Sequence, residues 1–185
     1  AIIAGGSEAS INELAMAGFI NCQALNLSDD PNAGSLPFDK RRAGFVMGEG
    51  AGMLVLEEYR HAKERGAKIL AEVVGYGNSS DAYHITAPDP EGDGAVRAIR
   101  MAIGEAGIND SDEVYVNAHG TGTHLNDAME TKALKTVFGE RAYKLHVSST
   151  KSMTGHMMGA TGAVEAIASV LALTGGTVPP TLKNT

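Results

Sequence analysis

Blocks of apolar residues with two different spacings alternate along this chain. Short apolar runs of the kind found in buried strands occupy residues 1–6, 52–59, 68–80, 113–120 and 144–152. Apolar residues at helical spacing occupy residues 10–26, 57–66, 94–107, 126–139 and 161–176. Strands that alternate with helices of this length predict an α/β fold, with helices packed on a mostly parallel sheet.

Local signals mark the ends of some of these elements. Ser10 and Glu13 have the spacing of a capping box at the start of the first helix. Gly107 is the last residue of the 94–107 pattern, where a helix would end. Residues 27–52 are rich in Gly, Pro and Asp and predict a long loop.

Composition narrows the class of protein. Of the 185 residues, 43% are hydrophobic and 20% are charged, which is typical of a globular domain. The net charge of -7 argues against a nucleic-acid surface. No unbroken apolar run suggests a membrane span, and no signal peptide opens the chain. A single cysteine, Cys22, cannot form an internal disulfide, so we expect the reducing cytoplasm.

The two ends of the sequence predict a piece of a longer protein. "AIIAGG" has the pattern of the end of a buried strand, and "GGTVPPTLKNT" ends in an extended, proline-containing segment.

Two loops with similar composition carry the candidate chemistry. His119 ends the strand of "VYVNAHGTGT", and Lys151 and His156 follow the next strand in "VSSTKSMTGHMMGATG". Adjacent parallel strands would bring both loops to one edge of the sheet, where active groups of α/β proteins gather. Two imidazoles and a lysine there could stabilise an oxyanion or move a proton.

Two other chemistries are weaker interpretations. His119, His124 and Asp127 could hold a metal, but neither a His-x-x-x-His spacing nor a cysteine pair is present, so we expect no metal. The loop "GTGTHLND" lacks the ending of a phosphate-binding P-loop.

The remaining candidates have structural interpretations. Among the histidines, His61 and His124 are expected to face solvent, His146 to lie in a strand, and His84 in a loop that could border a cavity. Met157 and Met158 could border an apolar channel, although methionine more often fills a core. Cys22 is expected to pack within its helix and not to act as a nucleophile.

Three long motifs resemble the β-ketoacyl-acyl-carrier-protein synthases: "PFDKRRAGFVMGEGAGMLVLEE", "NAHGTGT" and "SSTKSMTGHMMGATGAVEA". The resemblance covers nearly the whole chain and is strongest to the type II enzymes of bacterial fatty acid synthesis. It implies a thiolase-like fold of two βαβαβ halves in α-β-α-β-α layers. Residues 1–66 would end the first half, with dimer and entrance loops, and residues 67–185 would form an incomplete second half.

The resemblance also implies a reaction and roles for its residues. The reaction would be a decarboxylating Claisen condensation of an acyl-cysteine with malonyl-acyl carrier protein. His119 and His156 match the family's catalytic histidines, whose N–H groups would stabilise the malonyl thioester oxygen, and Lys151 matches its active-site lysine. The nucleophilic cysteine would lie upstream of Ala1.

Further positions match the family's supporting residues. Thr121 and Thr123 match hydroxyls that bind the pantetheine arm, and Asp127, Glu130 and Glu165 match acidic residues that would pair with Lys151. His124 departs from the family pattern, where proline is common.

By resemblance, the protein would need no cofactor, since its substrates arrive on phosphopantetheine. It would act as a homodimer and bind acyl carrier protein, with candidate docking residues Lys40, Arg41, Arg42, Lys63, Arg65 and Lys68. A polyketide ketosynthase, a subunit of the chain-length-factor kind and an inert fragment are the alternatives. Chain-length factors usually lose the catalytic residues that this chain keeps.

Overall fold

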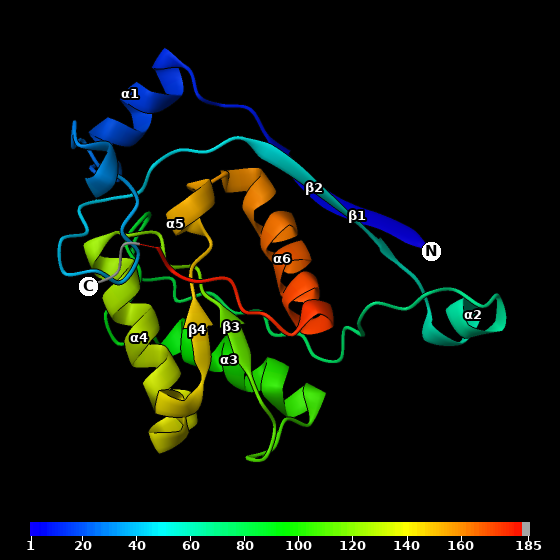
Figure 1. The fold of residues 1–185 in the computed structure, drawn as a ribbon. Coiled ribbons are helices and arrows are strands. Elements are labelled where there is room, and N and C mark those ends of the chain that lie inside the picture. The colour runs from blue at the N-terminus through cyan, green and yellow to red at the C-terminus, as the bar shows by residue number, and fades with distance from the viewer. Residues whose placement is uncertain (183–185) are drawn as a thin grey trace.

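The computed structural model describes residues 1–182, and Figure 1 shows its ribbon. The strands are β1 (Ile2–Glu8), β2 (Gly50–Leu56), β3 (Tyr115–Asn117) and β4 (His146–Ser148). The α-helices are α1 (Glu13–Asn21), α2 (Tyr59–Glu64), α3 (Asp93–Ala106), α4 (His124–Phe138), α5 (Lys151–Thr154) and α6 (Thr161–Gly175). Short 3-10 helices are η1 (Pro31–Ala33), η2 (Gly139–Lys144) and η3 (Met158–Ala160).

The strands β1 and β2 form an antiparallel ribbon, with Ile2 opposite Leu56 and Glu8 opposite Gly50. Helix α6 packs against this ribbon (Figure 1). At Gly52, an added Cβ would lie 3.1 Å from the backbone nitrogen of Val164 in α6. The glycine therefore allows the helix to approach the ribbon closely.

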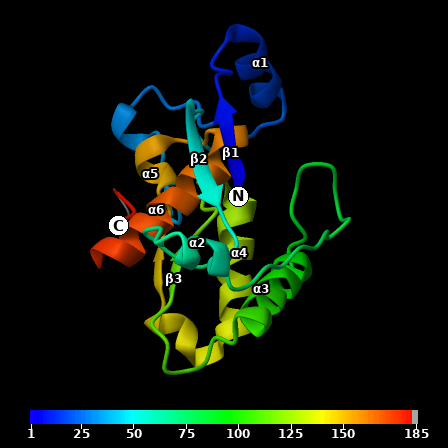
Figure 2. The same ribbon diagram turned by 90° about the vertical axis from the view of Figure 1, so that its right-hand side faces the viewer.

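The strands β3 and β4 form a parallel pair, with Tyr115 opposite His146 and Asn117 opposite Ser148. Helix α6 also contacts β3, so it lies between the two small sheets (Figures 1 and 2). Parallel pairing places the loop after β3 next to the loop after β4. The predicted meeting of these two loops at one edge is confirmed.

The prediction of one mostly parallel sheet is wrong for this part of the chain. Within residues 1–182 the strands form two separate pairs, one antiparallel and one parallel. The predicted strand over 68–80 has no strand partner and instead runs against α3, where Gly77 approaches the carbonyl of Ala98. Backbone groups become a strand only when a neighbouring strand pairs with them, and no strand of the described chain pairs with this segment.

Helix α1 begins and ends inside its predicted range of 10–26. Its N-cap is Asn12, whose side chain accepts a hydrogen bond from the backbone of Ala15, so the capping box predicted from Ser10 and Glu13 does not form. Cys22 caps the C-terminus and is exposed, which contradicts its predicted packing role. Helix α3 ends at Gly107 with a left-handed cap, as predicted.

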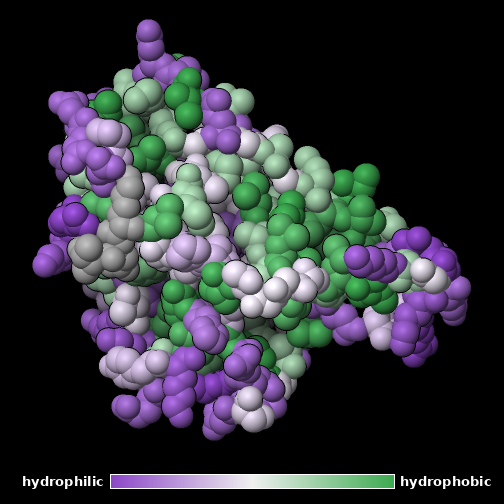
Figure 3. All heavy atoms as spheres, in the orientation of Figure 1, coloured by the Kyte–Doolittle hydropathy of each residue, from purple (hydrophilic) through white to green (hydrophobic). Residues whose placement is uncertain are grey.

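Apolar side chains are concentrated on the face formed by α6 and the β1–β2 ribbon (Figure 3). Leu171 and Leu173 of α6 are exposed, as are Ile3 and Val55 of the ribbon. Residues Met158–Gly175 have a mean hydropathy of 1.4 over 18 residues, which corrects the expectation that no segment is long and apolar enough to cross a membrane. Glycine, threonine, serine and glutamate residues interrupt the apolar positions of this segment, so it contains no unbroken apolar run of that length. One such helix is weak evidence for a membrane span, and this one carries Glu165.

The predicted division into residues 1–66 and 67–185 stays a prediction, and the last three residues of its second part lie outside the described residues.

Candidate active site

Three predicted catalytic residues follow the parallel strands. His119 lies two residues beyond β3, Lys151 begins α5 just beyond β4, and His156 lies in the turn between α5 and η3. The rings of His119 and His156 lie edge to face, with centroids 5.2 Å apart and an interplanar angle of 86°. The structure therefore brings together two imidazoles that are 37 residues apart in the sequence numbering.

The backbone of His156 is held by the segment before β2. Its N–H donates to the carbonyl of Val46 at 2.7 Å, and its carbonyl accepts from Gly48 at 3.0 Å. The ring of Phe45 lies edge to face with the His156 ring, with centroids 5.2 Å apart. The sequence pattern predicts a loop for this segment and gives no sign of its role, because nothing local to residues 45–48 indicates a partner so distant in the chain.

A backbone donor orients the imidazole of His156. The N–H of Met158 donates to Nδ1 of His156 at 3.3 Å. A backbone N–H can only donate, so Nδ1 acts as an acceptor and the neutral ring carries its proton on Nε2. Nε2 has no hydrogen-bond partner among residues 1–182, which leaves an N–H donor available at the site.

The backbone around His119 is held by Glu130 of α4. The Glu130 carboxylate accepts the N–H of His119 at 2.7 Å and the N–H of Gly120 at 2.8 Å. Gly120 has a φ of +35°, and an added Cβ would lie 2.6 Å from the Cβ of Ser149. The sharp turn after β3 therefore depends on a glycine and on a distant carboxylate.

Asp127 organises the loops around the site. It is 2% exposed and accepts the backbone N–H groups of Phe38 at 2.7 Å and Gly122 at 3.2 Å. The guanidinium of Arg42 lies 3.8 Å from this carboxylate and donates to the carbonyl of His124 at 3.0 Å. Asp127 thus joins the 35–42 loop to the start of α4.

Only one of the three predicted acidic partners pairs with Lys151. Lys151 is 1% exposed, and its Nζ lies 2.5 Å from Oε1 of Glu165 in α6. Asp127 and Glu130 instead accept hydrogen bonds from backbone N–H groups, and within residues 1–182 no ion pair joins either of them to Lys151.

Burial and charge keep both imidazoles neutral. Burial, followed by the Lys151 ammonium, lowers the pKa of His119 to about 4, although by surface area the residue as a whole is exposed. Burial, His119 and Lys151, in that order, lower the pKa of His156 to about 4. Near neutral pH each ring is uncharged and can present an N–H to an oxyanion.

The same burial acts in the opposite direction on the carboxyl groups. It raises the pKa of Glu130 against the two backbone hydrogen bonds that lower it. It also raises the pKa of Glu165, with the Lys151 hydrogen bond opposing. Burial therefore disfavours the ionised form of both carboxyl groups, and their hydrogen bonds favour it.

The predicted pantetheine hydroxyls lie together. Thr121 is 4% exposed, and its Oγ1 lies 3.0 Å from Oγ1 of Thr123. His124 is the first residue of α4 and is exposed, as expected. His61 and His84 are also exposed, His146 begins β4, and Met157 is buried in the core at 5% exposure.

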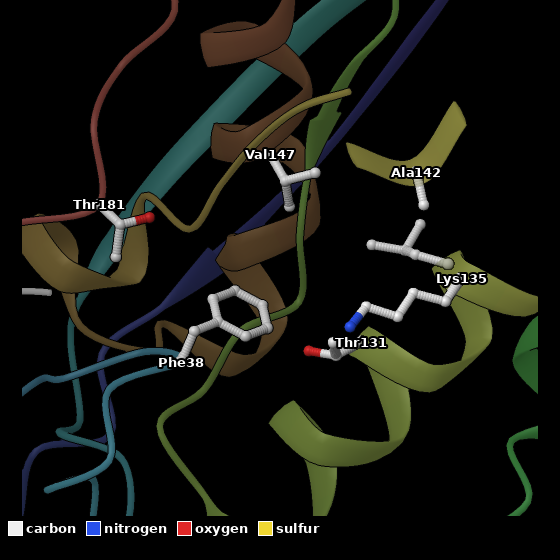
Figure 4. A pocket seen from close by; sticks show the side chains of 7 residues that line it. Phe38, Thr131, Lys135, Ala142, Val147 and Thr181 are labelled. Carbon is white, nitrogen blue, oxygen red and sulfur yellow. The ribbon is translucent and has the colours of Figure 1, made fainter. Parts of the chain in front are cut away.

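A pocket of about 380 Å³ lies between α4 and β4 (Figure 4). Its lining includes Phe38, Leu134, Val147 and Thr181, and neither histidine takes part. The pair of imidazoles, in which Nε2 of His156 has no hydrogen-bond partner among residues 1–182, is the better candidate for chemistry than this pocket. Among the described residues no cluster of three or more His, Cys, Asp or Glu side chains could hold a metal.

Comparison with known proteins agrees with this geometry. Residues 1–62 match the beta-ketoacyl synthase N-terminal domain, and residues 70–185 match the beta-ketoacyl synthase C-terminal domain. The chain belongs to the beta-ketoacyl synthase family. It is 54% identical to the 3-oxoacyl-[acyl-carrier-protein] synthases 2 of Staphylococcus aureus (strain COL) and Synechocystis sp.. These alignments cover 98% of this chain and 44% of each relative, so the chain spans less than half of their length.

Solved structures give the same class. A beta-ketoacyl synthase from Burkholderia phymatum superposes with a TM-score of 0.90 at 42% identity, covering 99% of this chain and 44% of that one. A type II polyketide ketosynthase, solved in complex with its acyl-carrier protein, superposes with a TM-score of 0.88 at 41% identity. It covers 93% of this chain, which spans 43% of that structure. The fold is thus the predicted thiolase-like α/β class.

Proposed function

We propose that this chain carries the decarboxylation centre of a 3-oxoacyl-[acyl-carrier-protein] synthase of fatty acid biosynthesis. The observation that carries the proposal is the edge-to-face pair of neutral imidazoles, His119 and His156, beside a buried lysine. The 54% identity to synthases 2 supports the fatty acid reaction over the polyketide one.

The chemistry follows from the N–H donors. When the bond between the malonyl carboxylate and its α-carbon breaks, carbon dioxide leaves and the electron pair moves toward the thioester oxygen. The Nε2–H of His156 and an N–H of His119 would donate to that oxygen where charge develops. The carbanion then attacks the carbonyl of the acyl-cysteine, and the cysteine sulfur leaves as the thiolate. That cysteine belongs, by resemblance, to a segment upstream of Ala1.

Lys151 would serve as a fixed charge in this scheme. Its ammonium is held by Glu165, and it adds to burial in lowering the pKa of both histidines. It thereby helps to keep the donors neutral at the pH of the cell. Lys151 is therefore assigned to electrostatics and not to nucleophilic attack.

The remaining features of the proposal follow the family. Thr121 and Thr123 would hydrogen-bond the pantetheine arm, acyl carrier protein would be the partner, and no cofactor would be needed. One of the solved relatives is a ketosynthase in complex with its acyl-carrier protein, which supports that partner. We also propose a cytoplasmic homodimer.

The docking residues proposed for the acidic carrier protein need narrowing. Arg41 pairs with Asp39, and Arg65 pairs with Glu57 at 2.6 Å. Arg42 is bound within the loop network of Asp127. Lys40 and Lys68 are exposed, and they are better candidates for contact with a carrier protein.

The test uses the complete polypeptide that carries this sequence. His119→Ala and His156→Ala should abolish release of carbon dioxide from malonyl-acyl carrier protein. Acyl transfer to the cysteine should continue in both variants, and the mass of the acylated protein measures it. His61→Ala is the matched control, because His61 is exposed and distant from the imidazole pair in sequence. Normal carbon dioxide release in both site variants would overturn the proposal. Condensation only with a polyketide carrier protein would favour the polyketide alternative.

A further inference from the structure

The hydroxyl of Thr161 reaches the same ring nitrogen as the Met158 backbone. Thr161 is the first residue of α6 and is 4% exposed, and its Oγ1 lies 3.1 Å from Nδ1 of His156. Nδ1 of His156 therefore has two neighbours that can donate hydrogen bonds, one from the backbone and one from a side chain. The proposed chemistry assigns no function to this threonine.

The direction of this hydrogen bond follows from what surrounds the hydroxyl. Within residues 1–182, Nδ1 of His156 is the hydrogen-bond partner found for the Thr161 side chain. Because Met158 N–H already requires Nδ1 to be an acceptor, the Thr161 hydroxyl must turn its proton toward the same lone pair. A buried hydroxyl without that bond would leave its proton without an acceptor, which is unfavourable.

The backbone contact is the weaker of the two. Met158 is not a glycine but has a φ of +38°, a left-handed conformation that costs free energy. Its N–H also lies farther from Nδ1, at 3.3 Å against 3.1 Å for the hydroxyl. The side chain of Thr161 thus supplies the shorter contact, and it does so from the rigid start of a fifteen-residue helix.

The remaining contacts of His156 do not influence which ring nitrogen carries the proton. Phe45 and His119 pack against the ring edge to face, and Val46 and Gly48 hold the backbone. None of these groups forms a hydrogen bond with a ring nitrogen among the described residues. Control of the tautomer therefore rests on the two donors at Nδ1.

We propose that Thr161 is a positioning residue that holds the neutral His156 ring with its proton on Nε2, directed at the developing oxyanion. The proposal rests on the proposed function for its catalytic consequence. Its structural part, the tautomer of His156, can be measured without any activity.

The structural test is nitrogen NMR of the complete polypeptide, labelled with 15N-histidine and measured near pH 7. In the parent protein, Nδ1 of His156 should resonate as an unprotonated nitrogen and Nε2 as a protonated one. Thr161→Val keeps the shape and removes the hydroxyl, and it should shift both resonances toward their average. Thr161→Ser should restore the parent values. Thr174→Val, the same change at an exposed site of α6, should leave them unchanged.

The kinetic test follows carbon dioxide release from malonyl-acyl carrier protein. Thr161→Val should lower kcat about fivefold to tenfold, as expected for one lost hydrogen bond, with KM nearly unchanged. Thr161→Ser should recover most of the rate. If Thr161→Val does not fold, Thr161→Ala removes the same hydroxyl and gives the same comparison.

Two outcomes separate this inference from the proposed function. Unchanged His156 resonances in a folded variant without the hydroxyl would overturn the positioning role, whatever the activity. A shifted tautomer together with normal decarboxylation in His156→Ala would uphold the positioning role and reject the proposed function.

Discussion

The ammonium of Lys151 lies 2.5 Å from the carboxylate of Glu165, and the lysine is almost completely buried at 1% exposure. The pair joins α5, which follows β4, to the first turns of α6. Hydrogen bonds from Thr150 to Glu165 and from Asn117 to its backbone carbonyl extend the contact to β3. The loop that carries the lysine is thus anchored to the central helix by charge and by hydrogen bonds.

Removal of the Glu165 charge should destabilise the protein. Glu165→Gln leaves a buried ammonium without a counter-charge, and we expect the free energy of unfolding to fall by about 3 kcal/mol. Denaturation by urea measures this change. The double variant Lys151→Met/Glu165→Leu removes both charges and should recover part of the loss. Equal urea midpoints for the parent and Glu165→Gln would show that the pair contributes little.

Asp127 should matter for stability more than a surface aspartate does. Asp127→Asn keeps the size of the side chain but weakens its hydrogen bonds with the N–H groups of Phe38 and Gly122, and we expect a loss of about 2 kcal/mol. Asp93→Asn is the control, because the Asp93–Arg97 pair is exposed and should contribute less than about 1 kcal/mol. Similar losses for both variants would contradict the organising role of Asp127.

A methyl group at Gly120 should disturb the turn that carries His119. In Gly120→Ala the Cβ would lie 2.6 Å from Ser149 and 2.8 Å from the ring of Phe38, at a φ of +35°. We expect a loss of about 3 kcal/mol in unfolding free energy, with lower decarboxylation in the complete protein. Gly162→Ala in α6 has no atom within 4 Å of the new methyl and should change stability by less than about 1 kcal/mol. A melting temperature that is equal in the two variants would argue against the steric interpretation.

The two histidines predict how stability depends on pH. Their pKa values of about 4 in the folded protein lie below the ordinary value of 6.5. Between these values the unfolded chain binds protons that the folded chain does not, so stability is lost as the pH falls from about 6.5 toward about 4. Urea denaturation at a series of pH values measures this loss.

A variant isolates the contribution of the histidines from that of the buried carboxyl groups. The raised pKa values of Glu130 and Glu165 act with the opposite sign. As the pH falls, these two groups bind protons more readily in the folded protein than in the unfolded chain, which stabilises the folded protein. The parent should therefore lose more stability than His119→Gln/His156→Gln between pH 6.5 and pH 4. Parallel curves for the two proteins would mean that the histidine pKa values are not lowered.

Local sequence patterns were sufficient to predict two long helices and the positions of the two histidines. Helices α3 and α6 lie close to their predicted bounds, because the spacing of their apolar residues and their terminal glycines are local properties. The positions of His119 and His156 after a strand were likewise visible in the chain. Parallel pairing of β3 with β4 was then enough to bring the two residues together.

Only the tertiary structure decided which groups hold these side chains. Phe38 and Asp127 are 89 positions apart, and Glu130 reaches the N–H of His119 across a turn, so no local spacing records either contact. The extended 68–80 segment shows the same limit, since strand formation needs a neighbour that the segment itself cannot supply. By itself, the sequence of this protein determined its periodic elements and the chemical types at its loops. The tertiary structure decided the hydrogen-bond partners, because buried N–H groups and charges bind whichever acceptor the folded chain brings within reach.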